Sequence, residues 1–152
     1  QEALSRGYRM GFTAGSDSHQ MEHGVEGGIV AVYTPTHNRA GIWDSMYDRH
    51  TYGTTGARIL VSLKVGHQIM GSELQMAAGE PVALDISVLG TADVKVELVK
   101  NNVVVAAWEP GCDSVDAQYV DTDRSASDYY YVRVTQTDEH MAWSSPIWVD
   151  QI

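Results

Sequence analysis

The sequence has one cysteine, few basic residues and no long apolar run, and each shortage excludes a class of protein. Cys112 is the only cysteine in 152 residues, so no disulfide can form within the chain. Ten Lys and Arg stand against 20 Asp and Glu, and the net charge of -10 repels phosphate backbones and anionic lipid. No apolar run approaches the roughly 20 residues of a membrane span. We therefore expect no nucleic-acid partner and no membrane partner.

Several catalytic motifs are also missing. The sequence contains no Gly-x-Ser-x-Gly, no P-loop, no dinucleotide fingerprint and no paired-Cys motif. It begins at Gln1 and not at Met, and its first residues look like the middle of a longer polypeptide. No signal-peptide pattern stands at the start. We therefore expect a processed or truncated piece of a longer protein, and the compartment stays open between periplasm and cytoplasm.

The first 56 residues predict an alternation of helices and strands, as in α/β folds. A short helix ends near Gly7, and apolar runs at 10–14 and 28–34 predict two buried strands separated by a polar loop. Thr36 can cap a second helix, for which Gly53 is the natural C-terminal stop. Apolar or aromatic residues at helical spacing mark the face of this helix that we expect to be buried: Ile42, Trp43, Met46, Tyr47 and His50.

After Gly56 the apolar period changes from helical to two, and we place a domain boundary there, between 1–56 and 57–152. Asn101 and Asn102 tolerate the positive φ that a two-residue hairpin needs. Residues 109–126 are acidic and predict an irregular segment around one short apolar stretch. The strands are expected at 59–65, 82–88, 94–98, 103–108, 129–137 and 144–149. This number and spacing favour an antiparallel immunoglobulin-like β-sandwich.

Tyr129, Tyr130 and Tyr131 form an aromatic run that, with two nearby tryptophans, could stack on sugars. Alternation along a strand places Tyr130 on one face and its neighbours on the other. We therefore predict a role in the core or in an interface in preference to ligand binding.

Asp17 and His19 are the leading candidates for a site. They lie two residues apart just after the apolar run 10–14, and both side chains are ordinary ligands for a divalent metal. The alternative is a turn aspartate that accepts backbone hydrogen bonds and a solvated loop histidine. Their position favours the site, because α/β folds place sites at the carboxyl ends of strands. Nearby residues of the same chemical types are expected to be exposed: Glu22, His23, Glu26 and His37.

Arg49 and Arg58 flank the turn at 53–56, and a guanidinium there could hold an anionic substrate through two hydrogen bonds. The competing interpretation is that Arg49 pairs with nearby acids and that Arg58 decorates a strand. The sequence does not decide between them.

Several blocks together resemble the C-terminal part of the uncharacterised family called domain of unknown function 3604. The blocks are 15–19 (GSDSH), 49–59 (RHTYGTTGARI), 70–71 (MG) and 142–148 (AWSSPIW). That family is in turn similar to the PHP (polymerase and histidinol phosphatase) metal-dependent phosphoesterases. In PHP-type proteins a late Gly-Ser-Asp-x-His element closes a β/α barrel and supplies two ligands of a cluster of two or three metal ions. The resemblance implies that Asp17 and His19 are metal ligands.

The resemblance implies an α+β chain, with the remnant of a PHP-like β/α barrel at 1–56 followed by the sandwich at 57–152. The parent would be a metal-dependent hydrolase of phosphoester-like small molecules that uses Zn, Mn or Fe. The early His-x-His element and the middle ligands of such enzymes have no counterpart here, so we expect weak metal binding or none from these 152 residues and no activity from them alone. The alternative function is a β-sandwich binding or interaction module attached to a catalytically silent barrel.

Strand edges lead to one further expectation. Strands at 10–14 and 28–34 without barrel neighbours would leave unpaired edges, which chains normally cover. We therefore predict that they pair with each other, with the sandwich or with a second copy of the chain, which makes a homo-oligomer possible.

Overall fold

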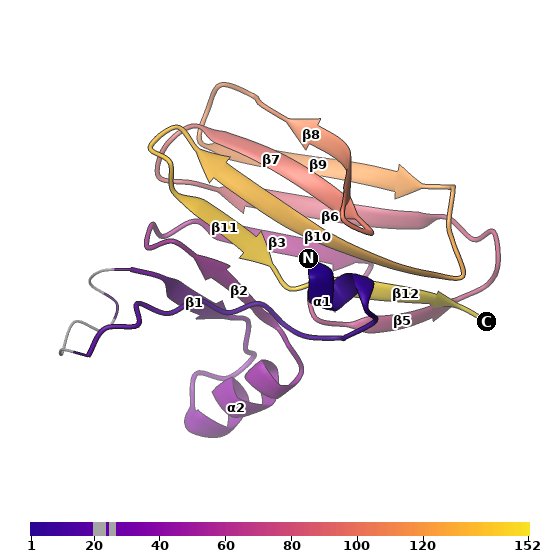
Figure 1. Ribbon diagram of the computed structural model, residues 1–152, viewed down its shortest axis with the longest axis horizontal. Coiled ribbons are helices and arrows are strands. Elements are labelled where there is room, and N and C mark those ends of the chain that lie inside the picture. The colour runs from indigo at the N-terminus through magenta and orange to yellow at the C-terminus, as the bar shows by residue number, and fades with distance from the viewer. Residues whose placement is uncertain (20–23, 25–26) are drawn as a thin grey trace.

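The computed structural model describes residues 1–19, 24 and 27–152, and in these residues the chain is mostly antiparallel β-sheet (Figure 1). Two short helices accompany the sheets in the described part, α1 (Glu2–Ser5) and α2 (Arg39–Tyr47). Neither has the length and apolar character needed to cross a membrane.

The larger sheet has eight described strands. Its main path runs β1-β2-β11-β10-β12-β5, and β7 pairs with the other edge of β10 and carries β8. β10 is long enough to pair with β12 along its first half and with β11 along its second half. Only β12 and β5 pair in parallel among these described strands. The bounds are β1 Ile29–Val32, β2 Thr51–Thr54, β5 Glu73–Met76, β7 Val94–Lys100, β8 Val103–Trp108, β10 Ser127–Gln136, β11 Met141–Ser144 and β12 Ile147–Gln151.

The smaller sheet runs β4-β3-β6-β9 within the described residues. Its strands are β3 (Leu60–Val65), β4 (Gln68–Ile69), β6 (Val82–Leu89) and β9 (Ser114–Asp121). β6 shows most plainly why the sheets pack together, because its residues alternate between fully buried and exposed along all eight positions. Such alternation gives a strand one apolar face to bury and one to leave in water.

The main core lies between the two sheets, and both contribute side chains to it. Val61 and Leu63 come from β3, whereas Leu98 and Val132 come from β7 and β10. A second, smaller cluster lies on the other face of the larger sheet, where Leu4 of α1 covers residues of three strands. Its buried members are Leu4, Val99, Tyr131 and Trp148. The expected division of the tyrosine run is confirmed, since Tyr130 lies in the main core and Tyr131 under α1.

Several strands were not expected from the sequence, and β9 and β5 are two of them. The acidic interval 109–126 contains β9, so the prediction of an irregular segment there is wrong. Val115, Ala117 and Tyr119 turn inward on β9 and alternate with polar residues, so the acidic composition obscured a period of two. β5 is the second, and it pairs with the chain's last strand, β12. The hairpin at Asn101 and Asn102 is confirmed, with φ angles of 49° and 67°.

The predicted strand at 10–14 is wrong, because residues 8–18 form no ladder and follow an irregular path. The predicted strand at 28–34 is present in shorter form as β1. It pairs with β2, which was not among the predicted partners, and β2 pairs with β11, so this edge is joined to the larger sheet. This sheet therefore runs across residue 56, and the barrel remnant and the division at residue 56 stay proposals.

The second helix is shorter than predicted, and much of the face that was expected to be buried is exposed. Asn38, not Thr36, caps α2, because its side chain accepts a hydrogen bond from the Gly41 amide at 2.8 Å. Gly53 lies within β2 and does not stop the helix; the positive φ after α2 belongs to Arg49, at 65°. Of the residues predicted to be buried, Trp43, Met46 and Tyr47 are exposed, whereas Ile42 and His50 are half-buried. Ser45 is the buried residue of α2.

Candidate functional site

The segment that carries Asp17 and His19 is held on the larger sheet by its backbone. The Phe12 amide donates a hydrogen bond to Ser145 Oγ at 2.8 Å, and the Phe12 carbonyl accepts one from Thr51 Oγ1 at 2.8 Å. The two hydroxyl groups lie 3.1 Å apart and are buried. This pair of hydroxyls therefore satisfies both backbone groups of Phe12, which has no neighbour in a ladder.

Glycines allow the segment to approach this closely. A methyl group placed on Gly53 would lie 3.0 Å from Ala14 Cβ, and one on Gly27 would lie 2.7 Å from Ser16 Cα. A side chain at either position would therefore occupy the space that the segment now fills. The path of residues 11–16 is defined by these contacts up to the residue before Asp17.

We call residues 11–16 the held segment. Asp17 and His19 follow directly after it, and both are exposed. Asp17 has φ at 53°, in the left-handed region that aspartate tolerates better than most residues. The adjacent Ser18 amide donates to Ser16 Oγ at 3.2 Å, so the segment turns here. Both the turn and the exposure fit a turn aspartate and a solvated loop histidine as well as they fit a pair of metal ligands.

A complete metal site is not present in the described residues. A carboxylate and an imidazole are suitable donors for Zn, Mn or Fe, but no group of three or more His, Cys, Asp or Glu side chains comes together in the part of the chain that the structure describes. The candidates Glu22, His23 and Glu26 lie outside the described residues. His37 is exposed, as expected. Asp17 and His19 therefore do not fit a metal ion on their own.

Arg49 is engaged in ion pairing. Its guanidinium lies 2.7 Å from Glu73 Oε1, 3.2 Å from the Gly71 carbonyl and 5.4 Å from the centre of the Trp148 ring. Arg9 reaches the other oxygen of Glu73 at 2.6 Å and Asp150 at 2.6 Å. These contacts match the competing interpretation, in which Arg49 pairs with an acid. Arg58 is exposed and makes no ion pair with another described residue.

A shallow depression of about 360 Å³ follows the held segment. Its lining carries no charged group, so it offers nothing that would neutralise a phosphate. The lining residues are Gly11, Phe12, Thr13, Gly53 and Trp143. A substrate phosphate would have to be bound by groups elsewhere.

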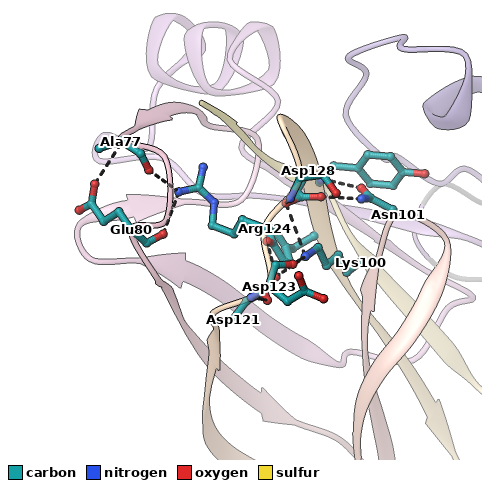
Figure 2. A network of polar contacts seen from close by, with 11 residues as sticks. Ala77, Glu80, Lys100, Asn101, Asp121, Asp123, Arg124 and Asp128 are labelled. Atoms are coloured by element: carbon teal, nitrogen blue, oxygen red, sulfur yellow. Dashed lines mark hydrogen bonds and ion pairs between the residues drawn. The ribbon is translucent and has the colours of Figure 1, made fainter. Parts of the chain in front are cut away.

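The most concentrated buried charge lies elsewhere, where β7, β9 and β10 meet (Figure 2). Lys100 Nζ lies 2.6 Å from Asp121 Oδ2 and 3.5 Å from Asp128 Oδ2, and it also donates to the Asp123 carbonyl. Asp128 is fully buried and accepts from Asn101 Nδ2 at 2.6 Å and from the Ser125 amide at 2.8 Å. Tyr130 donates its hydroxyl proton to Asp121 Oδ2 at 2.7 Å. We call Lys100, Asp121, Asp128 and Tyr130 the buried ion cluster.

The environment determines the charge states in this cluster. Burial alone raises the pKa of Asp121, but hydrogen bonds from Lys100 and Tyr130 outweigh it and hold the pKa below its ordinary value. Burial alone lowers the pKa of Lys100, and its contacts with both carboxylates outweigh that effect and raise it. Burial, followed by the bond to Asp121, raises the pKa of Tyr130. Sequence reasoning missed the cluster, because its members are separated by up to 30 positions of alternating strand sequence.

We expect the buried ion cluster to make the free energy of unfolding depend on pH in the acid range. The folded pKa of Asp121 is lower than its unfolded value near 3.8, so its contribution is present above that value and is lost as the pH falls through the folded pKa. The unfolding free energy of wild type and of Asp121→Asn, measured in urea, should therefore differ most near neutral pH and converge below about pH 4. Asp116→Asn, at an exposed position on the same strand, should show no such convergence. A constant difference between wild type and Asp121→Asn would contradict the assignment.

Comparison with known proteins identifies a family. The family model described as "Protein of unknown function (DUF3604)" matches residues 8–85. The chain belongs to the DUF3604 family. The match takes in the held segment, β1, α2 and β2 and continues into β6, so the candidate ligands lie in the part that the family shares.

Uncharacterised proteins from Chlamydia are similar along nearly the whole chain. One from Chlamydia pneumoniae is 33% identical over 179 aligned residues, which cover 98% of this chain, and one from Chlamydia muridarum is 34% identical over 176, which cover 97%. The chain spans 28% of the length of these relatives. The crystal structure of an engineered protein is 16% identical with a TM-score of 0.34, covering 59% of this chain and 20% of that protein.

Proposed function

We propose that this DUF3604 chain supplies two metal ligands, Asp17 and His19, to a metal-dependent hydrolase of phosphoester-like molecules. The observation that carries the proposal is the held segment, which ends by presenting a carboxylate and an imidazole two residues apart on the surface. The remaining ligands would come from parts of the full-length protein outside these 152 residues. The resemblance of 15–19 to the Gly-Ser-Asp-x-His element of PHP enzymes supports the same assignment. In this proposal residues 1–56 would be the remnant of a barrel of that kind.

In this proposal the roles of the chain's own residues are limited. Asp17 would contribute a charged oxygen and His19 a neutral nitrogen, and the metal would supply Lewis acidity once it is bound. Phe12, Thr51 and Ser145 would position the two ligands through the backbone. Arg58 is the better of the two arginine candidates for binding an anionic substrate, because Arg49 is already paired with Glu73. The sandwich at 57–152 would serve as an immunoglobulin-like accessory module.

Metal analysis of the full-length protein tests the proposal. Asp17→Ala should lower the bound metal at least about tenfold after dialysis, because loss of a ligand removes affinity and leaves the site incomplete. Asp116→Ala, an exposed acid on β9, is the matched control and should keep the wild-type metal content. Equal metal content in all three proteins would refute the proposal and favour the alternative of a binding module with a silent barrel. A panel of phosphoesters assayed with the same preparations would then define the substrate class.

A further inference from the structure

The apolar face of α2 is exposed to solvent. Trp43, Met46 and Tyr47 are 69%, 45% and 77% exposed, and their spacing places them on one side of the helix. Figure 1 shows α2 lying beyond the β1–β2 end of the larger sheet, away from the core between the sheets. The helix buries only Ser45. Three large apolar side chains on one helix are therefore left to water.

Two physical reasons indicate that the apolar face of such a helix packs against another segment. An isolated helix of nine residues is well below the length that is stable in water, so most of its stability has to come from packing. Contiguous exposed apolar surface on a folded domain also usually marks an interaction site. Asn38 caps the first turn, which supports helix formation but does not bury the apolar face.

We propose that the face formed by Trp43, Met46 and Tyr47 is the docking surface for the rest of the polypeptide in the full-length protein. Two observations favour this occupant. The chain matches its Chlamydia relatives over 98% of its own length but 28% of theirs, so most of each relative lies outside the match. α2 also lies inside the part matched by the family model, 8–85, so the helix belongs to what the family has in common.

The size of the face argues against a separate partner. Three side chains of this kind offer at most roughly 600 Å², whereas stable complexes between separate proteins bury about 800 Å² on each partner. An occupant on the same polypeptide acts at an effective concentration on the order of millimolar, so a smaller face is sufficient. The inference does not depend on the proposed metal chemistry.

The test compares two forms of the protein, the 152-residue chain and the product of the complete reading frame that encodes it. Trp43→Glu with Tyr47→Glu should lower the Tm of the complete protein by at least about 5 °C, because two charges replace buried aromatics there. The same double variant should leave the Tm of the 152-residue chain unchanged, because both side chains are already exposed in it. Val103→Glu, at a position on β8 that is 64% exposed, is the matched control and should change neither form.

Three results would overturn the proposal. One is an equal loss of Tm in both forms, which would mean that Trp43 and Tyr47 serve this chain's own fold. Another is a dimer of the 152-residue chain that Trp43→Glu dissociates, measured by light scattering, which would assign the face to a second copy. The third is a reading frame that adds no further residues. Unchanged metal content in the double variant would separate this inference from the proposed function.

Discussion

Replacing Lys100 by methionine is expected to lower the free energy of unfolding by about 3–5 kcal/mol, because it leaves two buried carboxylates without their cation. Asp121 is 4% exposed and Asp128 is fully buried, so water cannot replace the lost ammonium group. Methionine keeps most of the length and apolar volume of the lysine side chain, so the loss reports on charge more than on packing. Urea unfolding at neutral pH measures it.

Two further variants make this expectation specific. Lys95→Met removes a lysine that pairs with Glu109 at 2.7 Å on the surface, and it should leave stability nearly unchanged because water screens that pair. Asp128→Asn in the Lys100→Met background should recover part of the loss, because it removes one of the two uncompensated charges while keeping a group that can bond to Asn101. If Lys95→Met and Lys100→Met were equally harmful, burial of the cluster would not be the cause.

The strands of the two sheets were predictable from the sequence where one face of the strand is buried and the other is exposed to solvent. β6 shows this in full, since each of its four inward residues alternates with an exposed one. The same rule failed at β9, where acidic residues on the wet face made the interval look irregular. It also failed at 10–14, because this apolar run lies only partly buried against Gly53 of β2 and does not join the ladder of the sheet. The periodicity within a segment does not show which distant segment packs against it.

The candidate site was predictable only in part. The residue types and spacing of Asp17 and His19 identify possible ligands, but whether a third donor approaches them depends on segments far away in the chain or beyond it. Arg49 illustrates the same limit, because its partner Glu73 is 24 positions away and belongs to a strand that the sequence did not indicate. The hydroxyls of Thr51 and Ser145 come together only because β2 pairs with β11.

Substituting Gly53 tests whether the sheet positions the candidate ligands. Gly53→Val should lower the free energy of unfolding by about 1–3 kcal/mol, because overpacking against backbone cannot be relieved by a rotamer change. A Cβ at this position already lies 3.0 Å from the Thr13 carbonyl carbon and 3.1 Å from the Ala14 nitrogen. Because the obstruction comes from the held segment, the cheapest relaxation is for that segment to leave the sheet. The Phe12 amide, which bonds to Ser145 Oγ, should then exchange its hydrogen at least about tenfold faster.

Gly15→Ala is the matched control, since its added methyl would meet nothing within 4 Å in the same segment. It should leave both the stability and the exchange of the Phe12 amide close to wild type. Gly53→Ala should fall between Gly53→Val and wild type, because its methyl group needs a shift of only a few tenths of an ångström. In the full-length protein the same order should appear in metal content, since Asp17 and His19 follow directly after the displaced residues. Wild-type metal content in Gly53→Val, together with fast exchange at Phe12, would show that the ligands are positioned by something other than this sheet.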